Sequence, residues 1–249
     1  MATAQFLFFD KSVSVTPPGG HAEPLPITLG PGRQPNDLRL MFISASAAGR
    51  GGETSLTMKM SPNPPTGFTA AYFLSPSETH GVYYRRIQTG DVDASVSWPK
   101  PSGWQHFMHG LLTVRGHSPT VNPTAGSLTV IQTGGDTSAT VSSVTVPGAG
   151  TMLFFVGNVP TPGGTGWPAW AVAMGVPTGW THLEATDKSG QNFYAYGTEP
   201  SIVVFAKSFI GAGSTGAVSI PTARGGPAFA GLWMFLTPAS DVTGSVGAV

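Results

Sequence analysis

Two copies of one short motif decide the fold of this chain: Pro-Thr-Gly-Phe-Thr at 65–69 and Pro-Thr-Gly-Trp-Thr at 177–181. Proline and glycine favour a tight turn, whereas the aromatic residue and threonine that follow favour a strand. A turn placed directly before a strand is typical of antiparallel sheets. The motif therefore predicts an all-β fold in which one arrangement occurs twice.

The segments around the motif recur in the same order in both halves. The first half runs through 38–43, 57–60, 65–69, 82–86, 89–93, 94–99 and 110–115. The second half runs through 152–156, 170–174, 177–181, 203–207, 211–216, 217–221 and 231–236. Because the period is as long as a whole domain, we interpret the pattern as two copies of one domain.

The boundary between the copies is predicted at a Pro- and Gly-rich segment, 116–126, which is typical of a short, stiff linker. We assign 1–118 to the first domain and 119–249 to the second. Each domain contains roughly seven or eight candidate strands, and no long window has a helical apolar period. The sequence predicts two tandem, jelly-roll-like antiparallel β-sandwich domains with little helix.

The composition favours a component of an assembly. Charged residues make up 10 % of the 249 residues, against roughly 25 % in typical globular chains. A surface so poor in charge is expected to be covered in part by neighbouring subunits. The apolar closing strands, which contain Leu111, Leu112, Trp233 and Phe235, are the candidates for a contact between domains.

The charge pattern also bears on other partners. Lys plus Arg equals Asp plus Glu at 12 each, and the charges are scattered, so nucleic-acid binding is not expected. No stretch approaches the ~20 apolar residues of a membrane span, and no basic segment begins the chain as in a signal peptide. The absence of cysteine excludes disulfides and Cys-ligated zinc. We expect synthesis in the cytosol and no membrane insertion.

No motif predicts catalysis, a cofactor or a metal. His106 and His109 are the only close histidine pair, and on a strand this spacing points them to opposite faces. Asp91 and Asp93 fall in a predicted hairpin turn and are interpreted as turn residues. The acids lie mostly beside Gly, Pro, Ser or Thr, so the paired carboxylates of a glycosidase are not indicated. We predict a protein that is not an enzyme.

The aromatic residues carry the candidate contacts. Phe68 and Trp180 occupy equivalent positions after Pro-Thr-Gly, which favours a core position in both halves. Trp167 and Trp170 belong to a glycine-rich stretch, 163–170, and are the candidates for an exposed contact with a ligand or a protein partner.

The order of Pro-Thr-Gly-Trp, an apolar strand ending in Lys207, a Gly-rich turn at 211–216 and the closing strand 231–236 resembles a known module. It is the β-sandwich module of minor tail and tail-appendage proteins of bacteriophages, especially phages of actinobacteria. Residues 177–236 carry the better match, and 65–115 a weaker one in which Phe68 replaces the tryptophan. The resemblance implies a virion component, in some members one that binds the host surface, and it implies no catalytic residues.

We therefore expect a structural virion protein, a minor tail or appendage component that assembles through strand edges and apolar faces with other virion proteins and copies of itself. The terminal segments 6–9 and 242–249 are candidates to reach adjacent subunits. A capsid decoration protein is the alternative within the same class. A carbohydrate-binding module, which would recognise host-surface glycan, is the alternative from another class.

Overall fold

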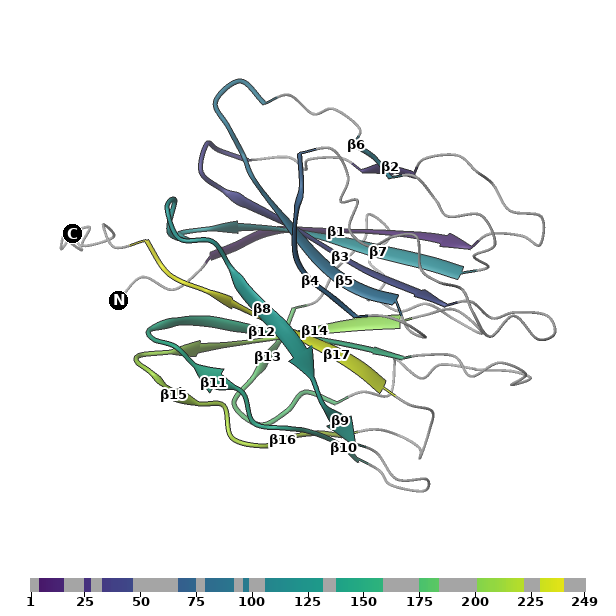
Figure 1. Cartoon of the computed structure of the whole chain (residues 1–249), viewed down its shortest axis with the longest axis vertical. Helices are drawn as coiled ribbons and strands as arrows, with labels where there is room; N and C mark the ends of the chain where they lie inside the picture. The colour runs from purple at the N-terminus through teal and green to yellow at the C-terminus, as the bar shows by residue number, and fades with distance from the viewer. Residues whose placement is uncertain are drawn as a thin grey trace, which may run out of the picture.

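A computed structural model describes residues 5–15, 25–27, 33–46, 67–74, 79–91, 96–98, 106–131, 138–158, 175–183, 201–221 and 229–239. These residues form antiparallel β-sheets, and the described part of the chain contains no helix. The predicted all-β class is confirmed. Figure 1 shows the strands arranged in stacked layers.

The first half of the chain forms a five-stranded sheet, here called sheet 1. Its strands, in spatial order, are β1 (Gln5–Val15), β7 (His106–Arg115), β3 (Leu38–Ser46), β5 (Thr79–Arg86) and β4 (Thr69–Leu74). A short pair, β2 (Leu25–Ile27) with β6 (Val96–Trp98), lies on one side of sheet 1 in Figure 1. The long central strands are rich in aliphatic and aromatic residues, which suits a sheet buried on its faces.

The second half forms another five-stranded sheet, sheet 2. In spatial order its strands are β8 (Thr124–Leu128), β17 (Phe229–Leu236), β12 (Gly150–Asn158), β14 (Ser201–Phe209) and β13 (Thr181–His182). Five short strands form an outer layer beneath it: β9 (Val130–Ile131), β10 (Ser138–Val141), β11 (Thr145–Val146), β15 (Gly213–Ser214) and β16 (Val218–Pro221).

The two halves have the same topology. Read along the chain, β1, β3, β4, β5 and β7 occupy in sheet 1 the places that β8, β12, β13, β14 and β17 occupy in sheet 2. The outer pair β2–β6 likewise corresponds to β10–β16. Among the described strands, every ladder joins strands of the same half. The repeat in the sequence is therefore matched by a repeat in strand order.

The registers of the sheets define which residues are equivalent. Thr69 pairs with Tyr84, and Thr181 pairs with Ala206, so Arg85 corresponds to Lys207. Matching the segments 82–86 and 203–207 end to end would instead equate Arg86 with Lys207. A shift of one residue exchanges the two faces of a strand, so only the register identifies the equivalent faces.

Sheets 1 and 2 pack face to face and share one apolar core. Sheet 1 contributes Leu38, Leu40, Phe42, Val82, Leu112 and Val114, whereas sheet 2 contributes Leu153, Phe155, Val204, Ala206, Leu232, Met234 and Leu236. The prediction of two separate jelly-roll-like sandwiches in tandem is not confirmed, because the largest sheet of each half is covered by that of the other. Packing of this kind removes apolar area from water on both sides at once.

The shared core has approximate two-fold symmetry. Phe42 and Phe155 are equivalent residues of the central strands, and their ring centroids lie 5.0 Å apart. Edge strand β4 approaches edge strand β8, and β5 approaches β17, so the strand order runs in opposite senses across the interface. Contact between equivalent residues near the middle is what a two-fold axis between the sheets produces.

Sheet 2 is buried on its other face as well. Met152, Phe154, Val156, Val203 and Phe205 face a second core that is completed by the outer layer through Ala139, Val141, Val146, Val218 and Ile220. Strand β12 therefore has apolar residues on both faces. This double burial explains the continuous apolar run in its sequence.

The Phe42–Phe155 contact gives a direct test of the shared core. We expect Phe42→Ala and Phe155→Ala each to lower the free energy of unfolding by about 3–5 kcal/mol, because each leaves a cavity. Since the rings touch, the double variant should lose less than the sum, by about 0.5–1.5 kcal/mol. Urea unfolding of the four proteins measures this coupling. Strictly additive losses would contradict the contact.

Candidate functional site

The Pro-Thr-Gly corner has the same geometry in both halves. Gly67 and Gly179 have φ values of +85° and +77°, a region that glycine adopts without steric cost. The aromatic residue that follows each glycine is buried, with 5 % of Phe68 and 7 % of Trp180 exposed. The equivalent cations Arg85 and Lys207 lie against the two glycines. The corner thus fixes a buried aromatic residue and a basic residue together.

Trp180 anchors the corner of the second half. Its ring stacks on Phe154 with centroids 4.2 Å apart, and the Lys207 Nζ lies 5.9 Å from the Trp180 centroid. The same ammonium lies 5.4 Å from the ring centroid of Phe209. A cation over aromatic faces is stabilised by the ring quadrupole. These contacts bind the corner to the second core and leave the indole ring without an exposed face for stacking.

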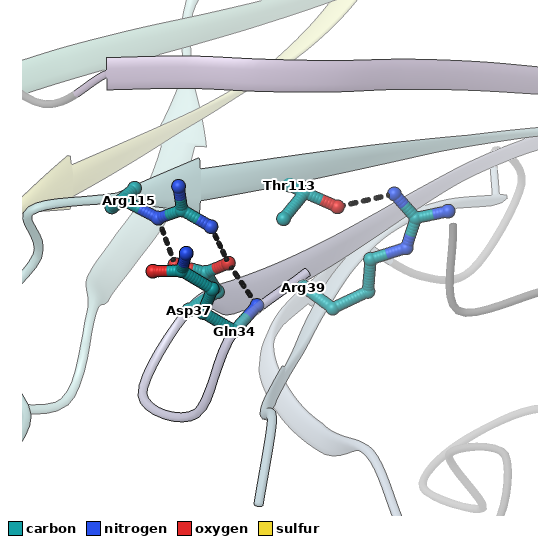
Figure 2. A network of polar contacts seen from close by, with 5 residues as sticks. All are labelled: Gln34, Asp37, Arg39, Thr113 and Arg115. Carbon is teal, nitrogen blue, oxygen red and sulfur yellow. Dashed lines mark hydrogen bonds and ion pairs between the residues drawn. The ribbon is translucent and has the colours of Figure 1, made fainter. Parts of the chain in front are cut away.

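One end of sheet 1 carries a cluster of charged residues. Figure 2 shows Arg115, at the end of β7, forming two parallel bonds to the carboxylate of Asp37, which precedes β3. The Nε–Oδ1 and Nη2–Oδ2 distances are 2.9 and 2.8 Å, and the Asp37 side chain is only 2 % exposed. The hydrogen bond to Asp37 raises the pKa of Arg115. Asp37 Oδ2 also accepts the N–H of Gln34 at 2.7 Å, which closes the turn.

Arg39 and Thr113 form a second polar contact in the same sheet. Arg39 is fully buried, and its Nη1 donates to the hydroxyl of Thr113 at 2.6 Å (Figure 2). By register, the equivalent residues of the second half are Met152 and Phe235. One copy of the module therefore holds a polar pair at a place where the other copy has apolar packing.

Asp91 closes the turn after β5, as the sequence predicted for this residue. Its Oδ2 accepts the N–H of Gln88 at 2.9 Å, and its Oδ1 forms an ion pair with Arg85 at 2.9 Å. Its backbone oxygen accepts from Arg33 Nη2 at 3.1 Å. Asp93 lies outside the described residues. The Asp91 carboxylate thus stabilises a turn and holds an arginine.

The linker is fastened to the charged cluster and to the end of β17. Arg86 donates to the backbone oxygens of Ser118 and Val121, at 2.7 and 2.5 Å. Ser118 N–H donates to Thr237 O at 2.8 Å, and Ala239 N–H donates to Gly116 O at 2.9 Å. These bonds join the linker to the last strand of the second half and to sheet 1. The linker is therefore a structural joint between the halves.

His117 is enclosed in this joint. Only 3 % of the residue is exposed, and its Nε2 lies 2.9 Å from Val121 O, so Nε2 carries the proton of that hydrogen bond. Burial, followed by the positive charge of Arg86, lowers the pKa of His117 to about 4. The imidazole is consequently neutral at ordinary pH.

The chemistry of the cluster is structural. Every contact described above joins an arginine or aspartate to a turn, to a linker carbonyl or to another strand. Guanidinium groups do not exchange protons near neutral pH, so they hold elements together rather than act as acids or bases. Within the described residues, no group of three or more His, Cys, Asp or Glu residues gathers as a metal site would require.

The other candidates of the sequence fall in different places. Trp167 and Trp170 lie outside the described residues. Leu111 and Leu112 are both buried in β7, and Leu112 belongs to the shared core. Trp233 and Phe235 pack in the second core, on the opposite face of β17 from the residues that meet sheet 1. The shared core contains Leu112 of β7, and from β17 it contains Leu232, Met234 and Leu236.

The joint was not predicted from the sequence. Asp37 and Arg86 lie far along the chain from Arg115 and His117, and the four residues match no motif. A weak signal exists: these residues flank strand ends in a chain with few charges, and a charge retained in such a chain is a candidate for a buried pair.

Comparisons with known proteins identify no relative. A scan against protein-family models finds no match, and searches of curated proteins and of solved structures find none either. In the described residues, no helix is long and apolar enough to cross a membrane.

The Asp37–Arg115 pair makes a prediction about stability. Arg115→Leu leaves the Asp37 carboxylate buried with only the Gln34 N–H, so we expect a loss of about 3 kcal/mol in the free energy of unfolding. Arg85→Leu removes the ion-pair partner of Asp91, whose side chain is 17 % exposed against 2 % for Asp37, and should cost about 1 kcal/mol or less. Urea titration of both variants checks the difference. Equal losses would contradict the assigned roles.

His117 predicts a dependence of stability on pH. Its pKa falls from 6.5 in the unfolded chain to about 4 in the folded chain, so the unfolded chain binds the proton more readily between these values. The free energy of unfolding is therefore highest above pH 6.5 in respect of His117. It decreases as the pH falls toward 4, by about 3 kcal/mol in all. Chemical unfolding at several pH values measures this. His117→Gln, which keeps an N–H donor, should have a flatter profile; an unchanged slope would exclude His117 as the cause.

Proposed function

We propose that this chain is a structural component of a bacteriophage virion, belonging to the tail, and that it acts by assembly rather than by catalysis. The observation that carries the proposal is an asymmetry of charge between the halves. Of the 24 Asp, Glu, Lys and Arg residues of the chain, 16 lie in 1–118 and eight in 119–249. Of those eight, only Lys207 falls in the part of the chain that the structure describes.

Exposed aliphatic residues follow the same asymmetry. The large hydrophobic side chains exposed in the described part are Val121, Ile131, Val176 and Ile210, and none precedes the linker. Depletion of charge with retention of apolar side chains is typical of surfaces that other proteins cover. A double sheet whose second half has half as many charged residues as the first suits a subunit that is embedded on one side and solvated on the other.

The resemblance of the Pro-Thr-Gly-Trp corner and the segments after it to phage tail modules supports the virion as the setting. The corner unites Trp180, Lys207 and Phe154 in one packed unit. A module in which the corner is part of the core can be repeated along a chain without changing its fold. Such repetition is useful in a tail protein, which needs a stiff body more than a cleft.

The experiment is to locate the chain on purified particles of the phage that encodes it. Antibody labelling seen by electron microscopy, with quantitative mass spectrometry of the same particles, should place it on the tail at the copy number of a tail component. A copy number that matches the capsid lattice would overturn the tail assignment in favour of decoration. Absence from intact particles would overturn the proposal as a whole.

A further inference from the structure

The joint between the halves is an antiparallel pairing of two short segments, 116–118 after β7 and 237–239 after β17. The segments meet in a bridge between His117 and Pro238, and a backbone hydrogen bond lies on each side of this bridge. Arg86, the last residue of β5, binds two carbonyl oxygens of the same linker. The joint therefore consists of the linker, the end of β5 and the segment that follows β17.

One carbonyl oxygen in the joint has two nitrogen donors. Val121 O accepts from His117 Nε2 at 2.9 Å and from Arg86 Nη2 at 2.5 Å. This shared acceptor brings the imidazole and the guanidinium to the same point. The guanidinium is always charged. A neutral imidazole is compatible with this arrangement, whereas an imidazolium adds a second positive charge to it.

The surroundings of His117 provide no compensating negative charge in the described structure. The linker, 116–126, and the segment 237–239 contain no Asp, Glu, Lys or Arg. Of the described charged groups, Arg86 is the one whose charge acts on His117. Arg115, two residues before His117, is bonded to Asp37. The Nδ1 atom of His117 is buried and has no hydrogen-bond partner in the described structure.

The joint lies outside both apolar cores. The shared core extends to Val114 on β7 and to Leu236 on β17, and neither core includes a residue of the joint. His117 and Ser118 are the buried residues of the paired segments. Parts of a protein that are held by few hydrogen bonds and little apolar area open at a lower free energy than a core. Opening of the joint is therefore compatible with sheets 1 and 2 remaining packed.

We propose that protonation of His117 opens this joint, so that in acid the linker separates from the end of β17 while the shared core stays closed. The proton comes from the solvent and binds Nδ1, because Nε2 already carries the proton that is donated to Val121 O. The register that equates Thr113 with Phe235 makes Ala239 the counterpart of His117. Only the first copy of the module thus supplies a titratable group to the joint.

The protonation equilibrium of His117 gives the pH range of this opening. Burial, followed by the charge of Arg86, lowers the pKa of His117 from 6.5 to about 4 in the closed joint. An exposed imidazole in the open joint has the ordinary pKa, so the open form binds the proton more readily. The closed form is favoured most above pH 6.5 and loses this advantage as the pH falls toward 4. Between about pH 7.5 and about pH 5, the open fraction should increase about 25-fold.

Native-state hydrogen exchange of the full-length chain tests the inference. The amides of Ser118 and Ala239 report on the joint, since each donates across it. After correction for the intrinsic exchange rate at each pH, their protection should decrease about 25-fold between about pH 7.5 and about pH 5. At both pH values it should stay below the protection of β12 amides. It should also be insensitive to low concentrations of urea, because a local opening exposes little surface.

Two variants test whether His117 is the cause. His117→Gln keeps an N–H donor but cannot take up the proton, so the protection of its joint amides should not change with pH. His182→Gln replaces a half-buried histidine of β13 and should keep the pH dependence of the natural chain. A His117→Gln variant as sensitive to pH as the natural chain would overturn the inference.

The natural chain alone can also overturn the inference, whether or not His117→Gln folds. One such result is equal protection of the Ser118 and Ala239 amides at both pH values. The other is a urea dependence of these amides equal to that of β12 amides, because the joint would then open only when the whole fold does. Neither result bears on whether the chain belongs to a virion.

Discussion

The packing of sheet 1 against sheet 2 is the interaction on which the rest of the structure depends. Each sheet presents a row of aliphatic and aromatic side chains, such as Leu40, Leu112, Leu153 and Met234, that are at most 1 % exposed. Full burial of one such side chain contributes about 1.5–3 kcal/mol relative to exposure. In the described structure, the inner face of each sheet is covered by the other sheet, so the two halves of the chain stabilise one another.

The approximate two-fold relation gives this packing a simple origin in the sequence. Equivalent strands supply equivalent faces, and the central pair Phe42 and Phe155 meets where an axis would pass. Farther from this axis, the residues of the two copies differ. The first half has the pairs Arg39–Thr113 and Arg115–Asp37, whereas the corresponding residues of the second half are Met152 with Phe235 and Thr237 with Gly150. The first half accordingly has 16 of the 24 charged residues of the chain, and the second half has eight.

The sequence predicts the strands better than their arrangement. The repeated Pro-Thr-Gly corners locate the turns before β4 and β13, and the continuous apolar run at β12 indicates burial on both faces, as observed. The sequence could not show that one face of β12 is covered by the sheet of the first half. A buried strand has the same apolar composition whichever element covers it. The register of the strands could not be predicted either. Alternation of apolar and polar residues shows which residues of one strand share a face, but it does not show which residue of the partner strand each one pairs with.

The polar residues show the same limit: contacts within a turn can be predicted from the sequence, whereas contacts between distant strands cannot. Asp91 acts in its turn as predicted, because a local hydrogen bond is encoded by neighbouring residues. The pairing of Asp37 with Arg115 spans most of the first half and depends on β3 lying beside β7. Native-state hydrogen exchange of the full chain tests the central claim most directly. If one core unites the sheets, amides of β3 and β12 will share a single free energy of opening; β12 amides that stay protected after those of β3 have opened would contradict it.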